Sequence, residues 1–309
     1  MDVLLLGIQI PLVLLLAPLV QGLIKMSKAR WQFRRGPGLL QPYRDILKWL
    51  SRESVVSEHA SWVFRWTPAI YAAAILTAAL LVPTVARRSP APGVADAVVL
   101  VALFALARFW LALAGIDTAS NFGGMGASRE VAFAALIEPA LLLVLFAVAL
   151  PVGSTSLTAL VGDGRPGASE LLAFGALLIV AIAETGRIPV DNPDTHLEVT
   201  MIHEGMLLEY SGRPLGVLHW ASQIKQLAIL SLLAALFLPW GMAPAGSTHL
   251  GDLAVGALAW GIKLAALGFL LGAIETAYAK LRIFRVPDLL GAASLLGILA
   301  VLATFVVEH

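Results

Sequence analysis

Glu138 lies in the middle of an apolar stretch, and its position indicates proton or ion transfer. An ionisable group inside a membrane span is costly, and such groups often mark an ion path. Glu138 precedes Pro139, whose ring removes a backbone hydrogen bond and can leave a hydrated kink. Glu130 lies eight residues earlier, on nearly the same face of a helix. The alternative is an ion pair between Glu138 and Arg108 that only fixes helix packing.

Two lysines also lie within apolar stretches. Lys263 is near the middle of 253–276 and twelve residues before Glu275, while Lys225 is less deep in 215–240. Burial readily shifts the pKa of a lysine, so that it can exchange protons. A counter-ion that fixes helix packing is an equal alternative for Lys263, and Lys225 could extend to the membrane interface.

The segment 184–214 is rich in acids and histidines, and prolines restrict its backbone. We expect Arg187 to orient this segment through a carboxylate, with Asp191 as the nearest candidate. Its density of charge beside a membrane predicts contact with a soluble partner, in which Asp194 takes part.

A second helix is predicted over 195–210. Thr195 and Glu198 match the S/T-x-x-E capping box, so capping is the simplest role of Glu198. Glu198 and Glu209 are eleven residues apart, which places them on one helix face, while Glu204 points from another. Three carboxylates near a membrane surface exceed what a cap requires. The predicted ion path comprises Glu130, Glu138, Glu184, Asp191, Glu198, Glu204, Glu209 and Lys263.

Two histidines, His196 and His203, are seven residues apart and share a helix face, which makes a metal site conceivable. However, His203 and Glu204 are not followed by the second histidine of an H-E-x-x-H motif, and the chain has no cysteine. We therefore expect no metal site, no catalytic residue and no redox centre on this chain.

A pair of arginines, Arg34 and Arg35, precedes the tight turn Gly36-Pro37-Gly38. Attraction to anionic lipid and docking of a soluble partner explain this pair equally well. The predicted docking residues are Arg34, Arg35, Gly36, Arg187, Asp194 and His203.

The composition shows what must hold these residues in place. Of 309 residues, 59% are hydrophobic and 13% charged, whereas a soluble domain is roughly a quarter charged. The sequence predicts an all-α, polytopic membrane protein that forms one domain over 1–309, and nothing in it suggests nucleic-acid binding. About eight spans are expected at 3–24, 66–86, 95–116, 130–151, 168–185, 215–240, 253–276 and 287–307.

Orientation follows from the distribution of Lys and Arg, which remain on the cytoplasmic side. Of 21 such residues, 15 fall in the first, third, fifth and seventh connections and 3 in the other three connections. Both termini should therefore lie outside the cytoplasm. Two cytoplasmic segments stand out: the basic segment 25–65, with an amphipathic surface helix from about Leu39 to Leu50, and the acidic segment 184–214 with its helix.

Several motifs resemble those of the subunit that joins the membrane and peripheral arms of respiratory complex I. They are an R-x-G-P turn after the first span, charged positions around the fourth span, and an E-x-x-R-x-P-x-D run followed by an acidic E-Y-S loop. The matching residues are Arg34 to Gln41, Ala119, Ser120, Asn121, Arg129, Glu130, Glu138, Glu184, Arg187, Pro189, Asp191, Glu198, Glu209 and Tyr210.

The match to the hydrogenase branch of this family is more specific. Residues 41–48, 187–193 and 196–204 resemble the membrane-anchor subunits of complex I-related nickel–iron hydrogenases, such as formate hydrogenlyase and hydrogenase-4. The complex I version usually carries Phe where this chain has Val190. The resemblance covers essentially the whole chain.

The resemblance implies a membrane-anchor and coupling subunit of a membrane-bound oxidoreductase in a bacterial or archaeal cytoplasmic membrane. Such a subunit holds a soluble nickel–iron hydrogenase-like arm and links it to proton or sodium translocation. The implied partners are large and small hydrogenase-like subunits, an iron–sulfur subunit, antiporter-like membrane subunits and lipid, with the nickel–iron centre and iron–sulfur clusters on the partners. A quinone-site-forming subunit of complex I is the first alternative, and a stand-alone ion transporter is a more distant one.

Overall fold

The computed structural model describes residues 2–162, 167–192, 201–247 and 249–307, and it is built from helices. The long helices are α1 (Asp2–Trp31), α3 (Trp62–Leu81), α4 (Ala97–Asp117), α5 (Asn121–Val152), α7 (Ala168–Glu184), α9 (Gly212–Phe237), α10 (Leu250–Ala277) and α11 (Val286–Val307). The short ones are α2 (Gln41–Leu50), α6 (Leu157–Leu160), α8 (His203–Leu207) and the 3-10 turn η2 (Ile283–Arg285).

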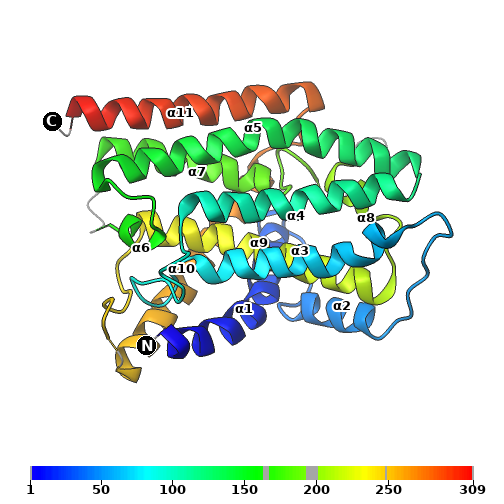
Figure 1. Cartoon of the computed structure of the whole chain (residues 1–309), viewed down its shortest axis with the longest axis horizontal. Helices are drawn as coiled ribbons and strands as arrows, with labels where there is room; N and C mark the ends of the chain where they lie inside the picture. The colour runs from blue at the N-terminus through cyan, green and yellow to red at the C-terminus, as the bar shows by residue number, and fades with distance from the viewer. Residues whose placement is uncertain (1, 163–166, 193–200, 248, 308–309) are drawn as a thin grey trace.

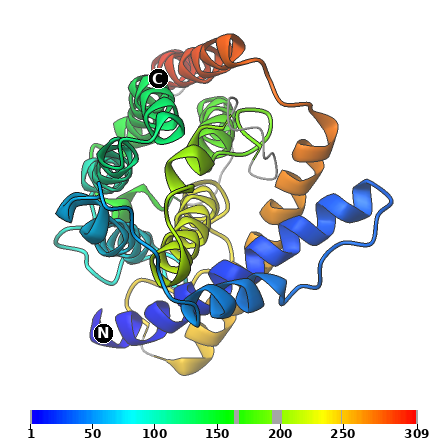
Figure 2. The ribbon, with the colours of Figure 1, turned by 90° about the vertical axis from the view of Figure 1, so that its right-hand side faces the viewer.

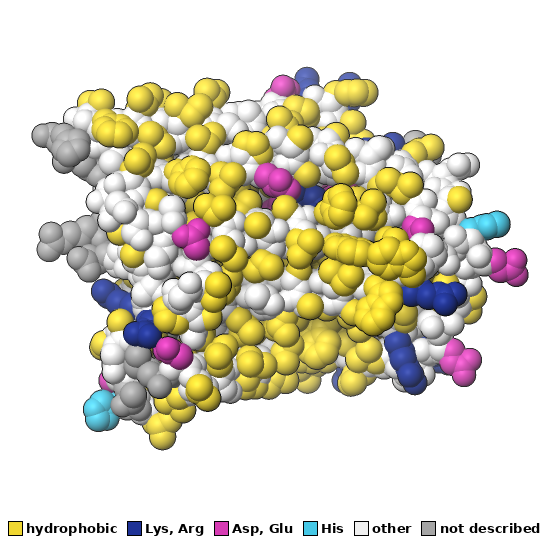
Figure 3. All heavy atoms as spheres, in the orientation of Figure 1, with side chains coloured by type: hydrophobic (Ala, Val, Ile, Leu, Met, Phe, Trp, Pro, Cys, Tyr) yellow, Lys and Arg dark blue, Asp and Glu magenta, His cyan; other side chains and the backbone are white. Residues whose placement is uncertain are grey.

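The long helices form a bundle whose long axis is horizontal in Figure 1. Turned by 90°, most of them are seen close to end-on, whereas α1 and α10 run obliquely along one side (Figure 2). Hydrophobic side chains cover the middle of the face in Figure 3, and charged side chains gather mainly toward its two ends. This distribution of side chains is typical of a membrane protein, because the bilayer core solvates apolar groups and excludes most charges.

The predicted membrane fold is confirmed. Seven helices are long and apolar enough to cross a membrane, namely α1, α3, α4, α5, α9, α10 and the stretch from Ile283 to Val306. The predicted fifth span corresponds to α7, which has 17 residues, at the short end of the range for a transmembrane helix. The start of α1 and the end of α11 lie at the same end of the bundle (Figure 1), so the chain crosses an even number of times and α7 provides the eighth crossing.

One span ends earlier than the sequence suggested. Helix α3 stops at Leu81 rather than at 86, and the following residues turn back across the bundle end. There Gln9 of α1 donates hydrogen bonds to the carbonyls of Ala79 and Val82 at 3.1 and 3.0 Å. A side chain thus supplies a partner for two of the carbonyls at the end of α3, which would otherwise lack one.

The predicted helix over 195–210 is wrong in its described part. Residues 193–200 lie outside the described residues, so Asp194 and the Thr195–Glu198 cap lie outside them too. Residues 201 and 202 are not helical, and α8 covers only His203–Leu207. The segment instead packs against α5, where a Cβ on Gly126 would lie 2.8 Å from the Ile202 carbonyl oxygen. Glu198 and Glu209 therefore do not share one continuous helix.

The predicted surface helix is present as α2. It packs against α9 and α1 and buries Pro42 and Ile46, while Leu47 stays exposed. The Trp49 ring stacks on His219 of α9 with centroids 4.4 Å apart. This contact fixes α2 across one end of the bundle.

Candidate functional site: buried charge clusters and a polar cavity

Arg108 of α4 is the centre of the first group of buried charges, which we call the Arg108 cluster and which also holds Glu130, Glu138, Glu184 and Lys225. Its guanidinium lies 2.6 Å from the Glu138 carboxylate and 3.4 Å from that of Glu130, and it pairs with Glu184. Glu184 also accepts from Lys225 of α9 at 2.7 Å. Four long helices thus contribute to one network, which confirms that Glu130 and Glu138 share a face of α5.

The charges in this cluster do not balance. It holds three carboxylates and two cations, so its formal charge is negative when every group is ionised. Glu130 and Glu138 compete for one guanidinium, since within the described part of the chain Arg108 is the cation that lies within ion-pair distance of each. The cluster therefore carries one carboxylate more than it has cations, and burial of such an excess charge is costly.

Glu138 differs from the other members in its exposure. Its side chain is 35% exposed, whereas that of Glu184 is 1% exposed. The ion pair between Glu138 and Arg108, which the sequence offered as the structural alternative, is therefore present. Its carboxylate is nevertheless partly exposed, so Glu138 can contact whatever covers this face.

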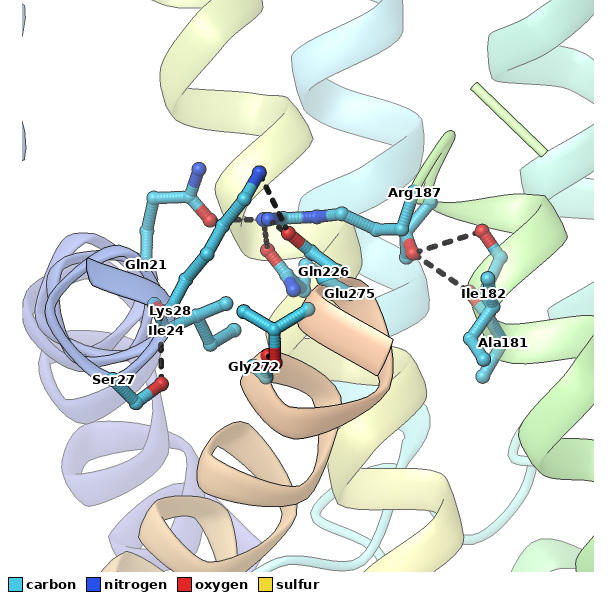
Figure 4. A network of polar contacts seen from close by, with 12 residues as sticks. Gln21, Ile24, Ser27, Lys28, Ala181, Ile182, Arg187, Gln226, Gly272 and Glu275 are labelled. Carbon is cyan, nitrogen blue, oxygen red and sulfur yellow. Dashed lines mark hydrogen bonds and ion pairs between the residues drawn. The ribbon is translucent and has the colours of Figure 1, made fainter. Parts of the chain in front are cut away.

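Arg187 is the centre of the second group, the Arg187 cluster, which also holds Glu275, Lys28, Gln21 and Gln226 (Figure 4). Arg187 lies 3.0 Å from Glu275 of α10, and Lys28 of α1 lies 3.3 Å from the same carboxylate. The other end of the guanidinium donates to the amide oxygens of Gln21 and Gln226. Here one carboxylate is shared by two cations, and amides fill the remaining hydrogen bonds.

The predicted pairing of Arg187 with Asp191 is wrong. Asp191 pairs with Lys280 at 2.8 Å, and the Leu281 amide donates to the Pro189 carbonyl at 2.8 Å. Glu275 is the better partner for Arg187 because α10 brings it to the guanidinium inside the bundle. Both Arg187 and Asp191 are buried. Through their side-chain contacts they tie the segment after α7 to α1 and to α10 with the residues that follow it.

A polar cavity of about 330 Å³ lies between the two clusters. Residues of α1, α2, α5, α9 and the segment after α7 line it, including Glu130, Glu184 and Arg187. Within the described residues, Gln223 Oε1 and Gln226 Nε2 in its wall are buried and have no hydrogen-bond partner. A cavity this large and polar accommodates several water molecules that can satisfy such atoms.

Two titratable groups outside the spans have shifted pKa values, and one of them, His203, lines the cavity. Burial lowers the pKa of His203 below its usual 6.5, a shift that the field of Glu130 opposes. Burial raises the pKa of Tyr210, whose hydroxyl donates to the Phe64 carbonyl at 2.9 Å. The lowered pKa favours the neutral form of His203, which lines the cavity.

The remaining predicted residues fall into four groups. Glu204 and His203 line the cavity. Glu209, Arg34, Arg35 and Gly36 are exposed at the bundle end that carries α2. Lys263 contacts neither cluster. Asp194 and Glu198 lie outside the described residues.

The sequence analysis did not name three residues that complete the clusters: Lys28, Gln21 and Gln226. Lys225 and Glu275 were noted but not placed on the path. Because buried charges need partners, both could have been expected to join a cluster. The glutamines carry no such signal, since a glutamine in a long helix is common.

Taken together, the fold and the site define a multi-pass membrane subunit whose spans enclose a chain of charges ending in a water-accessible polar cavity. The chain belongs to the NADH dehydrogenase family, whose model matches residues 3–307.

Two relatives from Escherichia coli (strain K12) are similar over most of the chain. Formate hydrogenlyase subunit 4 is 37% identical over 276 residues, which cover 88% of this chain and 88% of the relative. Hydrogenase-4 component C is 39% identical over 240 residues, covering 76% and 75%. The chain is thus a membrane subunit of the kind found in respiratory complexes.

One solved structure has the same fold. A chain of the membrane-bound sulfane sulfur reductase, an archaeal respiratory membrane complex, matches with a TM-score of 0.82 and 21% identity. The match covers 97% of this chain and 98% of that one. At this identity the likeness concerns the fold alone.

Proposed function

We propose that this chain anchors a soluble nickel–iron hydrogenase-like arm in the cytoplasmic membrane and couples its redox reaction to proton or sodium translocation. The observation that carries this proposal is the direct contact between the polar cavity and the Arg108 cluster. Glu130 and Glu184 belong to both. The nickel–iron centre and iron–sulfur clusters belong to the partners, and this chain supplies the charges that respond to them.

The proposed path starts at the cavity and ends at the exposed edge of Glu138. A change of charge at the cavity end alters the electrostatic field at Glu184 and Glu130. Both carboxylates contact Arg108, which also contacts Glu138, so the effect reaches Glu138 through one shared side chain. Because electrostatic interactions are strong where water is excluded, a proton gained at one carboxylate lowers the hold of Arg108 on it. Glu138 then exchanges a proton with an adjoining antiporter-like membrane subunit.

The proposed docking face is the bundle end that carries α2. It presents Arg34 and Arg35 before a tight turn and Glu209 after α8, all exposed. With both termini at the opposite end, the surplus of Lys and Arg at this end favours a cytoplasmic location. Arg187 and His203 act from inside this face, because they hold the segment after α7 in place rather than contact a partner directly.

Glu184→Gln tests the coupling half of the proposal. In inside-out vesicles that contain the whole complex, we expect hydrogen-linked redox turnover to persist while proton or sodium uptake falls about tenfold or more. Asp252→Asn is the matched control, because it removes an exposed carboxylate at the far end of the bundle. Equal uptake per turnover in wild type and Glu184→Gln would refute coupling through this cluster.

Docking is tested separately with the double variant Arg34→Gln and Arg35→Gln. We expect this chain to insert normally but to retain less of the soluble arm during purification, most clearly at high salt. Lys48→Gln, which removes one exposed cation from α2, should retain the arm. If the double variant retained the soluble arm fully, the docking role of the two arginines would be refuted, and contact with lipid would be their remaining role.

A quinone-binding subunit is the second candidate, and the cavity volume favours it. About 330 Å³ lies within the range of small-molecule sites, but the wall holds more charged and amide groups than such sites usually do. This alternative would be favoured if turnover depended on quinone and short-chain quinones restored it. A Phe133→Trp substitution in the cavity wall should then block that turnover.

A further inference from the structure

Glu138 places a carboxylate on the outer surface of a membrane span. It lies well inside α5, with more than about 20 Å of helix on either side at 1.5 Å per residue. Its side chain is 35% exposed, although Glu138 is not among the residues that line the polar cavity. The exposed part of the carboxylate therefore lies at the surface that the bilayer or a neighbouring subunit covers.

The surface around Glu138 is otherwise apolar. Val131 and Ala135 precede Glu138 by seven and three residues on α5, so they share its side of the helix, and both are exposed. Leu106 and Phe109 are exposed on the adjoining helix α4. In the hydrophobic middle of the face drawn in Figure 3, acidic side-chain atoms lie beside basic ones. A small side chain such as that of Ala135 allows a second helix to approach closely.

Three possible coverings of this surface differ in their charge. Acyl chains donate no hydrogen bond and headgroups lie outside the hydrocarbon core, so lipid leaves the carboxylate without a partner for its exposed part. A second copy of this chain, related by a two-fold axis, would bring a second Glu138 to the same interface and add negative charge.

A helix with a basic side chain is the covering that balances the charge. The Arg108 cluster holds three carboxylates and two cations, and Glu138 is its most exposed carboxylate. A cation from a neighbour would pair with the carboxylate that the cluster holds in excess, in an environment where unpaired charges are costly.

We propose that the α4–α5 face around Glu138 binds a transmembrane helix of another membrane subunit, and that this helix carries a lysine, arginine or histidine at the level of Glu138. The basic side chain donates to the exposed part of the carboxylate, which also accepts from Arg108. The neighbour thereby brings the cluster to three carboxylates and three cations. This inference rests on the proposed assembly with antiporter-like subunits and adds the chemistry of the contact, but it does not depend on ion translocation.

The neighbouring helix is first located by cross-linking in the intact complex. A benzophenone analogue of phenylalanine at position 109 replaces the exposed ring of Phe109 with a photoreactive one. It should cross-link to one membrane subunit, within an apolar span that contains a basic residue. The same analogue in place of Phe305, which is exposed on α11, should not reach that span. Cross-links from position 109 to lipid alone, to a second copy of this chain, or to a span without a basic residue would each overturn the proposal.

The charge of the contact is then tested by substitution. Glu138→Gln keeps the shape of the side chain but leaves the neighbour's cation without its carboxylate, so we expect about tenfold less of the neighbour in the purified complex. Asp252→Asn, which changes an exposed carboxylate at the far end of the bundle, should retain it. The soluble arm should stay bound in both variants, which shows that the chain has folded.

A change on the neighbour's side tests the same pair without altering this chain. Glutamine in place of the basic residue that the cross-link locates should cause the same loss as Glu138→Gln, and both changes together should cost no more than either alone. Full retention of the neighbour in either single variant, or losses that add, would overturn the proposal. Ion uptake per turnover, which tests the proposed coupling, is not the quantity measured, so the two proposals can fail separately.

Discussion

The Arg108 and Arg187 clusters contain similar groups but opposite balances of charge. Around Arg108, three carboxylates share two cations, and one carboxylate is 35% exposed. Around Arg187, two cations share the single carboxylate of Glu275, which is 3% exposed, and two glutamines accept the remaining hydrogen bonds. The first cluster thus has one carboxylate more than its cations, whereas the second has one cation more than its carboxylate.

This difference separates a cluster with an excess of carboxylates from one whose contacts join several elements of the fold. The Arg187 cluster joins α1, α9, α10 and the segment after α7, so it fixes the walls of the cavity. The Arg108 cluster lies beside the cavity and holds one more carboxylate than it has cations. Buried charges alone therefore do not distinguish the two clusters; the balance of acids and bases within each cluster does.

The largest expected effect is from Arg187→Ala. Removal of the guanidinium leaves Glu275 with Lys28 alone and leaves the amide oxygens of buried Gln226 and half-buried Gln21 without their donor. This should destabilise the protein by about 3–5 kcal/mol. The measurement is the melting temperature of the chain in nanodiscs, with Arg44→Ala on the exposed face of α2 as control. A change as small as that of the control would mean that this cluster does not hold the fold.

His203 lies between the clusters, and its lowered pKa predicts acid sensitivity. Above the unfolded value of 6.5, His203 is neutral in both states and adds no pH dependence. As the pH falls below 6.5, the unfolded chain binds a proton that the folded chain refuses, so stability falls by up to about 1.4 kcal/mol per pH unit.

His203→Gln should flatten this decline in a melting series between about pH 8 and pH 5. His59→Gln, a change at an exposed histidine, should leave the decline intact. Parallel curves for wild type and His203→Gln would show that His203 is solvated rather than buried beside the cavity.

Tyr210→Phe provides a reference for an ordinary neutral hydrogen bond away from both clusters. The variant loses the bond to the Phe64 carbonyl but keeps the ring stacked on Phe64, with centroids 3.9 Å apart. We expect a loss of about 1 kcal/mol in unfolding free energy. A loss comparable to that of Arg187→Ala would make the packing of this segment, not its charges, the main source of stability.

Glu138→Gln should have the smallest effect on stability. Its side chain is partly exposed and shares Arg108 with two other carboxylates, so its removal should cost less than about 1 kcal/mol. Denaturation of the purified chain checks this, with Glu184→Gln expected to cost more because it is buried. A severe loss for Glu138→Gln would make the pair with Arg108 structural.

Sequence patterns predicted the spans well because hydropathy is a local property. They placed α7 at 168–185 against the observed Ala168–Glu184, and α11 at 287–307 against Val286–Val307. The shared face of Glu130 and Glu138 was also predictable, since eight residues is a helical repeat.

The errors came from contacts between distant parts of the chain. Arg187 and Glu275 are 88 residues apart, so proximity in sequence favoured Asp191 wrongly. The capping pattern at Thr195 and Glu198 suggested a helix to 210, but contacts with glycine positions on α5 draw residues 201–202 into another conformation. Tertiary packing thus overrode a local signal.

The most direct test of the central claim is a pH-induced infrared difference spectrum of the full chain in nanodiscs. The account predicts that acidification produces a protonated-carboxyl band that Glu130→Gln or Glu138→Gln removes and that Asp252→Asn leaves unchanged. A band that persists in both Glu130→Gln and Glu138→Gln would show that the Arg108 cluster takes up no proton, and would contradict the account.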